Sequence, residues 1–147
     1  MIVLPRAAQR LWLTAFLDYA NGNGPGPNPL LMLHLYTNDI APGPLTNVAD
    51  FVEASFHGYA AKGIAGLFPF PVTNADGLAE SRSGNLIFAA TDQVINETVH
   101  GWYLTLQSDV VPAVLAAAER IVPAVRMNLP AAAVCVNVRL ALGSKFA

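Results

Sequence analysis

The segment from Ala131 to Gly143 shows the clearest periodicity in the chain. Apolar residues stand at every second position from Val134 to Leu142, and Asn137 and Arg139 are among the residues between them. Only a strand places such residues on one face, because successive side chains of a strand point to opposite sides. β-branched valines also favour the extended backbone. We therefore predict a strand with one face in a core, while Asn137 and Arg139 face solvent or a partner.

The composition is unusually poor in charge. Of the 147 residues, 54% are hydrophobic and 12% are charged, whereas soluble domains usually contain about 25% charged residues. A chain of this length can bury a sizeable core, so we expect a single domain, 1-147. A monomer with so few charges would expose large apolar patches, which usually mark a surface that another protein covers. The composition predicts a homo-oligomer or a component of a larger assembly.

Two classes of partner are not expected. The net charge is −2 and the eight Lys and Arg residues are dispersed, whereas nucleic-acid binding needs a basic patch. Glu119 and Arg120 interrupt the apolar stretch 110–125, so we expect no membrane span. The one cysteine, Cys135, allows no internal disulfide, which suits synthesis in a reducing compartment.

Residues 1-22 are predicted to form an N-terminal helix. Apolar side chains recur at three- and four-residue spacing along one of its faces: Ala8, Leu11, Trp12, Ala15, Phe16 and Tyr19. Leu13 and Leu17 lie beside this face, so the helix is apolar over more than half of its circumference and suits packing on two surfaces. Four of these side chains are our candidate contacts to a neighbouring subunit: Leu11, Trp12, Phe16 and Tyr19. The alternative is that the helix only covers its own sandwich.

A linker of turn-forming residues, 23-29, separates this helix from the remainder of the chain, 30-147. Period-two alternation predicts strands at Leu30–Thr37 and Val99–Leu106. The first of these is apolar on both faces, which suits a strand that is buried on both sides.

Turn-forming residues divide the middle of the chain into shorter predicted elements. Leu78–Arg82 and Leu86–Ala90, joined by Ser83-Gly84-Asn85, predict a β-hairpin. Prolines between Tyr59 and Val72 indicate one or two short, irregular strands at a sheet edge.

Several motifs resemble a widespread group of small tailed-bacteriophage proteins. In that group a strand ending in Leu-[Phe/Tyr]-x-Asn precedes a proline-containing turn and an Ala-Asp-[Phe/Leu]-x-Glu-Ala-x-[Phe/Tyr]-x-Gly-Tyr segment. The matching segments here are LHLYTNDIAPGP (33–44), VADFVEASFHGYA (48–60), VHGWYLT (99–105), LAAAERI (115–121) and RLALGS (139–144). The 23-29 linker and the apolar helix before it depart from the pattern.

The resemblance implies a non-enzymatic virion structural protein. Its implied fold is all-β, a jelly-roll-like antiparallel β-sandwich of about eight strands with one N-terminal α-helix. Its implied role is that of a capsid decoration or cement protein, or a tail-associated component, assembled in the host cytoplasm and located in the virion. The implied partners are copies of itself, most simply in a trimer, and the major capsid protein or tail proteins.

The stretch from Val110 to Val125 can be interpreted in two ways. Its alanines favour a helix, whereas Pro112 and Pro123 favour strands. The resemblance, rather than propensity, favours strands at Val114–Arg120 and Val122–Met127.

The sequence offers no catalytic residue, no cofactor-binding residue and no metal ligand that we would single out. His34, His57 and His100 lie on separate predicted elements without metal-binding spacing. Asp50 and Glu53 have the spacing of an acid–base pair, but capping of a short helical turn by Thr46 or Asn47 with Asp50, and solvation, explain them more simply.

Ser108-Asp109 with His100 supplies the residue types of a triad, but no nucleophile elbow accompanies them. Cys135 is expected to be a buried, inert thiol. The first alternative function is a tail-associated carbohydrate- or receptor-binding sandwich, suggested by the polar loop 91–98 and by five aromatic residues: Trp12, Trp102, Tyr36, Tyr59 and Tyr103. The second is a small hydrolase or isomerase on a barrel-like fold, which would require converging polar residues.

Overall fold

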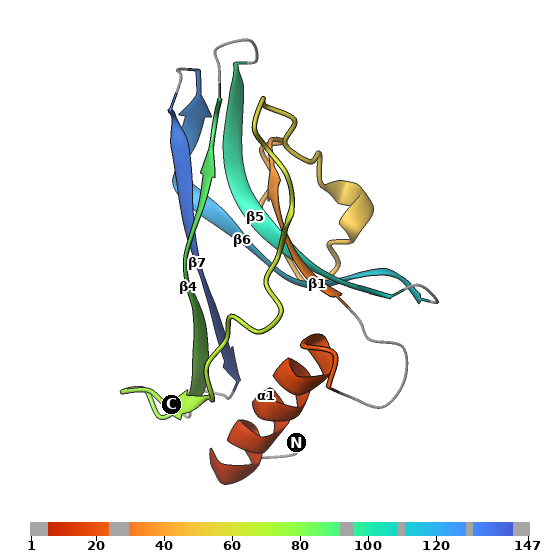
Figure 1. Ribbon diagram of the computed structural model, residues 1–147, viewed down its shortest axis with the longest axis vertical. Coiled ribbons are helices and arrows are strands. Elements are labelled where there is room, and N and C mark those ends of the chain that lie inside the picture. Colours follow the sequence, from red (N-terminus) through yellow and green to blue (C-terminus); the bar gives the residue numbers. More distant parts are fainter. Residues whose placement is uncertain (1–5, 24–29, 92–95, 109–110, 129–130, 143–147) are drawn as a thin grey trace.

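Two antiparallel sheets face each other, and helix α1 (Arg6–Ala20) lies at one end of them (Figure 1). This computed structural model describes residues 6–23, 30–91, 96–108, 111–128 and 131–142. Within them the first sheet has the order β2-β1-β5-β6 and the second β3-β4-β7. The strands are β1 Leu30–Tyr36, β2 Lys62–Gly63, β3 Val72–Thr73, β4 Ala79–Ala89, β5 Glu97–Ser108, β6 Val111–Met127 and β7 Ala133–Leu142. The predicted all-β sandwich with one N-terminal helix is confirmed.

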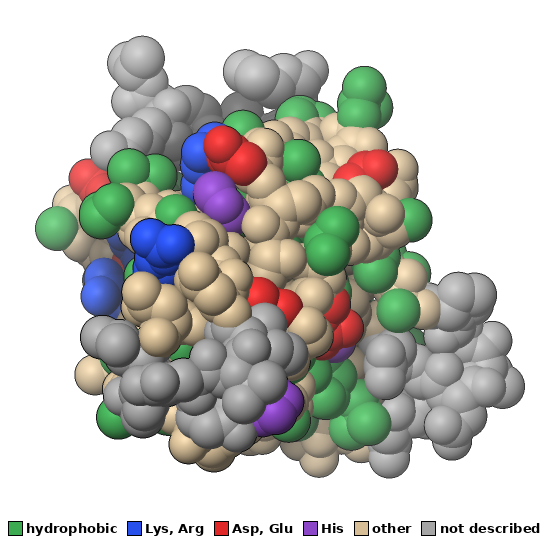
Figure 2. Space-filling view, turned by 90° about the horizontal axis from the view of Figure 1, so that it is seen from above, with side chains coloured by type: hydrophobic (Ala, Val, Ile, Leu, Met, Phe, Trp, Pro, Cys, Tyr) green, Lys and Arg blue, Asp and Glu red, His purple; other side chains and the backbone are tan. Residues whose placement is uncertain are grey.

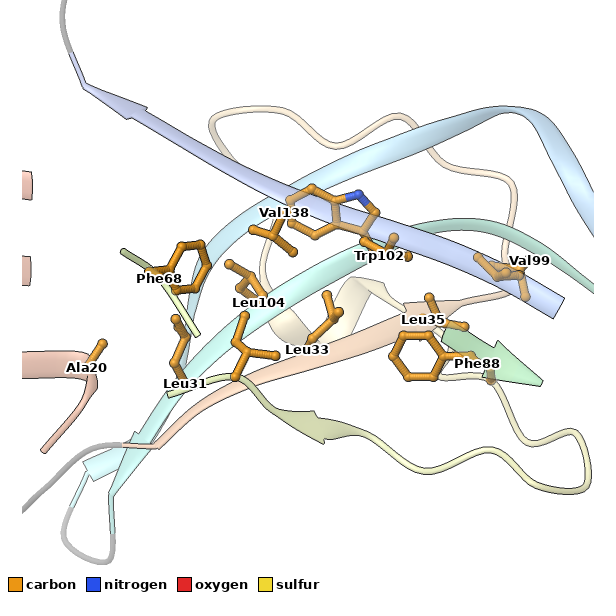
Figure 3. Close-up of a cluster of buried hydrophobic side chains, with 14 of the residues drawn as sticks. Ala20, Leu31, Leu33, Leu35, Phe68, Phe88, Val99, Trp102, Leu104 and Val138 are labelled. Atoms are coloured by element: carbon orange, nitrogen blue, oxygen red, sulfur yellow. The ribbon is translucent and has the colours of Figure 1, made fainter. Parts of the chain in front are cut away.

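The core fills the space between the two sheets. Leu31, Leu33 and Leu35 project from one side of β1 into this space, where Leu104 of β5 and Val138 of β7 also lie (Figure 3). The opposite side of β1 is covered as well, because Tyr36 is fully buried with Phe51 and Tyr103 in a second cluster. The expectation of a strand buried on both faces is therefore confirmed at Tyr36, whereas Met32 and His34 on the same face are half-buried.

Strand β7 has the alternation that its sequence predicts. Val134, Val136 and Val138 are buried, whereas Asn137 and Arg139 are exposed on the outer face of the sheet. Cys135 lies on that outer face too and is an exposed free thiol. The expectation of a buried thiol is wrong, because in this sheet the face opposite the valines is not covered by another layer of the described chain.

The predicted hairpin between residues 78 and 90 does not form. Strand β4 runs through Ser83 and Gly84 without reversing, and its register with β7 shifts between Arg82 and Asn85. Gly84 has a φ of 77°, which glycine adopts without strain, and the Ser83 Oγ accepts the Val138 N–H at 3.1 Å. The turn-forming residues thus make a β-bulge inside one long strand.

The segment that was ambiguous between helix and strand is β6, an edge strand of 17 residues. Its register with β5 shifts where Val99 pairs with Val125 but Gly101 pairs with Arg120. The break expected near Val122 is therefore present as an irregularity in a single strand. In the 59–72 region, β2 and β3 are short strands at sheet edges, as the prolines predict.

Candidate interface on helix α1

Helix α1 is apolar on two opposite sides. The side chains buried against the sandwich are Gln9, Leu13, Leu17 and Ala20. On the outer side Leu11 and Trp12 are 69% and 63% exposed, and Tyr19 is also exposed. The stripe with the strongest periodicity therefore faces outward, and the residues expected to flank it form the inner contact.

The inner contact joins α1 to the second sheet. α1 packs against β4, β7 and β3 at the end of the sandwich (Figure 1), and Ala20 lies beside Leu31 and Phe68 in the core cluster (Figure 3). Because the inner side alone fixes the helix, the outer stripe is not needed to hold it in place.

A cavity of about 330 Å³ lies beside the outer stripe. Its lining includes Trp12, Leu13 and Phe16 of α1, Leu104 of β5, Ala116 of β6 and the end of β7. The described residues that line it carry no charge, so this hollow is suited to an apolar occupant. Phe16, the fourth candidate contact, is half-buried at its edge.

The other flank of α1 adjoins more exposed apolar surface. Phe70 is 63% exposed, and the guanidinium of Arg10 lies 5.4 Å from the centre of its ring. Val72 of β3 is exposed nearby in the chain. Figure 2 shows the end of the molecule opposite α1, where hydrophobic side chains are scattered among acidic, basic and histidine side chains.

The two candidate contacts on β7 are bonded within the chain. The Asn137 Nδ2 donates to Asn85 Oδ1 at 3.1 Å, and the Arg139 Nε donates to Glu80 Oε2 at 2.7 Å. They lie on a strand rather than on α1, so the structure divides the six predicted contacts between two elements. Their side chains connect β7 to β4.

Glu80 is a buried carboxylate at the centre of an ionic cluster whose two arginines are exposed. Its carboxylate accepts hydrogen bonds from the Asn74 amide at 2.7 Å and from Arg82 and Arg139. The bond from Asn74 and the two guanidinium groups hold the pKa of Glu80 at about 2, although burial opposes this shift. The cluster was not predicted from the sequence, because Arg139 is far along the chain from the other three residues and joins them only through the pairing of β4 with β7.

A hydrogen-bonded chain on the outer face of the first sheet joins Thr105, His34 and Glu53. The His34 Nδ1 lies 2.8 Å from Glu53 Oε1, and its Nε2 lies 2.9 Å from Thr105 Oγ1. Because a carboxylate only accepts hydrogen bonds, Nδ1 carries the proton and a neutral ring accepts from Thr105. The order of groups is that of a nucleophile, base and acid. Thr105 is only 2% exposed, however, so its hydroxyl is closed to a substrate.

These hydrogen-bonded side chains instead hold the segment that contains Glu53 and Tyr59 against the first sheet. The Tyr59 hydroxyl donates to Glu53 Oε1 at 2.7 Å and accepts the Leu35 N–H at 3.1 Å. The rings of His34 and Phe51 both stack on the ring of Tyr103, with centroid distances of 4.7 and 4.5 Å. Burial, assisted by the charge of Glu53, raises the pKa of Tyr103 to about 12.

The remaining candidate groups have separate partners. The Asn47 N–H donates to Asp50 Oδ2 at 2.7 Å and caps the 3₁₀ turn Val48–Asp50, as predicted, so Asp50 does not pair with Glu53. The His100 Nδ1 lies 3.5 Å from Asp39 Oδ1. Asp109, which would complete the proposed triad with His100, lies outside the described residues.

The described part of the chain contains no group of three or more His, Cys, Asp and Glu side chains placed to hold a metal ion. It also contains no helix with the length and hydropathy needed to cross a membrane. No protein-family model matches the chain, and neither a curated protein nor a solved structure shows significant similarity to it.

Proposed function

We propose that this chain is a non-enzymatic virion structural protein of a tailed bacteriophage, a capsid decoration or cement protein that oligomerises and stabilises the head by surface contacts. The observation that carries this proposal is the outer stripe of α1. Leu11 and Trp12 project from a helix that its other side already anchors, beside an apolar cavity. Exposed apolar surface of this kind supports a role in which the chain is covered by other proteins.

A cement protein works by contact rather than by chemistry. Each 1,000 Å² of apolar surface that neighbouring subunits cover contributes up to about 25 kcal/mol before association costs. Such contacts are most effective when the surface is rigid, because little conformational entropy is then lost on association.

The fold supplies that rigidity in the segment after β1. The Glu97 carboxylate of β5 accepts the Ser55 N–H at 2.9 Å and the Phe56 N–H at 3.1 Å, and Glu53 and Tyr59 fasten the same segment to β1. This irregular segment is thus held at several points by strands of the first sheet. Rigid loops on a sandwich support binding to a fixed lattice.

The alternative of a tail-associated carbohydrate- or receptor-binding sandwich has weaker support. Aromatic platforms for sugars must be exposed, but Tyr36, Trp102 and Tyr103 are buried and Tyr59 is half-buried. Of the five aromatic residues that suggested this function, only Trp12 is largely exposed. An enzymatic function is not supported either, because the Thr105 hydroxyl of the triad-like chain is buried.

Locating the chain in particles tests the proposal. Virions purified from cells that produce the chain are analysed by quantitative mass spectrometry and electron cryomicroscopy. We expect a high copy number and sandwich-shaped density at regular sites on the head. Density confined to the tail, together with binding to a glycan array, would favour the alternative, and absence from the particles would refute both.

A further inference from the structure

Strand β6 lies at one end of the first sheet, and in the described part of the chain only β5 pairs with it. The other side of such a strand presents backbone N–H and C=O groups to which a further strand can bond. Proteins usually protect these edges with prolines and charges. Pro112 lies before the middle of β6, and Glu119, Arg120 and Pro123 lie after it, but residues 113–118, Ala-Val-Leu-Ala-Ala-Ala, contain neither. The middle of the edge is therefore unprotected.

A β-bulge makes the backbone of this stretch more accessible. Leu104 of β5 pairs with Ala117 and Thr105 pairs with Leu115, so Ala116 is an extra residue between two pairs. The extra residue of a bulge is left out of the ladder. Ala116 is also exposed, and its short side chain leaves room for another backbone beside it.

Two hollows adjoin Ala116. The first has a volume of about 290 Å³ and is lined by residues 115–118 of β6, by Pro42–Pro44 and by Thr46. The side chains of a strand alternate between its faces, so a hollow that touches four consecutive residues follows the strand edge. The loop that contains Thr46 forms the opposite wall of this groove.

The second hollow is the apolar cavity of about 330 Å³ beside α1, which Ala116 also lines. Its lining includes three consecutive residues of β7, 140–142, and β7 is the end strand of the second sheet. The cavity therefore lies between the edges of the two sheets, where Trp12 and Phe16 of α1 form part of its wall. A strand added to β6 at Ala116 would have one hollow on each of its faces.

We infer that the middle of β6 binds an extended segment of a partner protein, which adds a strand to the first sheet beside Ala116. Backbone hydrogen bonds supply affinity in this mode of binding, and pockets for alternate side chains supply specificity. The side chain that enters the cavity beside Trp12 is large and apolar, and the next one along the segment, which meets Thr46, is small or polar. This inference rests on the proposed function, because it names how the chain engages another virion protein.

The two hollows fit a different protein better than a second copy of this chain. Two β6 strands paired with each other would offer residues 113–118 to one another, and these contain four alanines and no side chain larger than leucine. The cavity of about 330 Å³ would then stay largely unfilled, whereas the cores of protein interfaces are packed as densely as protein interiors. The partner segment therefore carries a large apolar residue that β6 lacks.

Fluorescent synthetic peptides test this inference on the full chain. The probe is Lys-Thr-Val-Thr-Xaa-Thr-Val-Thr-Lys, whose β-branched residues favour an extended backbone and whose Xaa is Phe, Leu, Ala or Asp. Fluorescence anisotropy measures the dissociation constants. We expect the Phe peptide to bind about tenfold more tightly than the Ala peptide, a difference of about 1.4 kcal/mol, and the Asp peptide to bind most weakly.

Methylation of the peptide backbone separates strand addition from adsorption through side chains. Alternate residues of a paired strand direct their N–H groups to opposite edges. Two versions of the Phe peptide, N-methylated on one set of alternate residues or on the other, therefore differ in which edge is blocked. We expect one version to lose binding and the other to retain it. An equal effect of both would contradict strand addition.

A charge on the edge provides the matched test in the protein. Ala116→Lys places an edge-blocking lysine in the unprotected stretch, and Ala124→Lys is the control because Ala124 is also exposed on β6 and lines neither hollow. We expect the dissociation constant of the Phe peptide to rise about tenfold in the first variant and to stay unchanged in the second. Circular dichroism verifies that both variants fold.

The remaining outcomes overturn the inference. Equal affinity for the Phe and Ala peptides, or equal effects of the two lysine variants, would place binding elsewhere on the chain. Absence of binding by every peptide at millimolar concentration would show that the edge of β6 takes no strand. Each of these results leaves the proposed function standing, because the location of the chain in virions tests that separately.

Discussion

The ring of Tyr36 lies directly over Gly101, with no space left for a side chain at position 101. A Cβ there would be 2.4 Å from Tyr36 Cζ and 2.3 Å from the carbonyl oxygen of Glu119. Tyr36 belongs to β1, Gly101 to β5 and Glu119 to β6, so this one glycine lets a buried side chain cross the middle strand of three.

We predict that Gly101→Ala destabilises the fold by about 3 kcal/mol, because overpacking usually costs about 1–3 kcal/mol and one of the obstructing atoms belongs to the backbone. Urea unfolding followed by circular dichroism measures the change. Gly43→Ala is the matched control, since a Cβ at position 43 meets nothing within 4 Å. Equal stability of the two variants would contradict the close approach of Tyr36.

The buried Glu80 predicts a loss of stability in acid. Its pKa is about 2 in the folded protein, against 4.5 in a free side chain. As the pH falls below 4.5, the unfolded chain takes up the proton first, so the stabilisation by Glu80 is present above pH 4.5 and lost towards pH 2. Urea midpoints measured between pH 6 and pH 2 are expected to fall more steeply for the wild type than for Glu80→Gln. The same slope in both proteins would refute the role of Glu80, and Glu119→Gln is the exposed control.

The raised pKa of Tyr103 leads us to expect that stability falls as the pH rises in the alkaline range. Burial raises its pKa from 10.0 to about 12. The unfolded chain therefore releases this proton first, and stability that is constant below pH 10 declines between pH 10 and pH 12. Tyr103→Phe is expected to reduce the slope without removing it, because burial also raises the pKa of Tyr59. Spectrophotometric titration at 295 nm is expected to show the delayed ionisation directly.

Removal of the Tyr59 hydroxyl is expected to lower the stability of the fold modestly. It accepts the Leu35 N–H at 3.1 Å and donates to Glu53, so Tyr59→Phe leaves a backbone donor without its partner. We expect a loss of about 1–2 kcal/mol and faster amide exchange at Leu35. Unchanged exchange at that amide would contradict the hydrogen bond even if the stability fell.

Cys135 provides a test of which face of the second sheet is covered. It is exposed on β7, and contacts made through the outer stripe of α1 would not use this face. One equivalent of a thiol reagent such as DTNB is therefore expected to react without denaturant, at the same rate at high and low protein concentration. Protection at high concentration would indicate that neighbours cover Asn137 and Arg139 instead of α1.

Periodicity predicted those elements in which burial alternates regularly. The valines of β7 and the leucines of β1 follow a period of two because each strand has a face in the core, and the sequence alone identified both. The Ser83-Gly84 bulge was mistaken for a turn, because the same residue types permit both and the choice depends on the pairing of β4 with β7. Local sequence does not contain that long-range pairing.

The candidate site was only partly predictable for a related reason. The spacing of Leu11, Trp12 and Tyr19 predicted an apolar stripe, but not that Leu13 and Leu17 would take the inner side, since both sides of α1 are apolar. The Thr105–His34–Glu53 chain was missed altogether. Its signal lies within the quoted 48–60 motif, whose Glu53 and Tyr59 both bond to the β1 region.

The position of α1 at the open end of the sandwich couples assembly to folding. Leu13, Leu17 and Ala20 fill the end of the core while the opposite side of the same helix is available to a neighbour. A force applied through that neighbour would be transmitted to the core by these three side chains. Weakening the inner packing of α1 is therefore expected to weaken any contact made through its outer side as well.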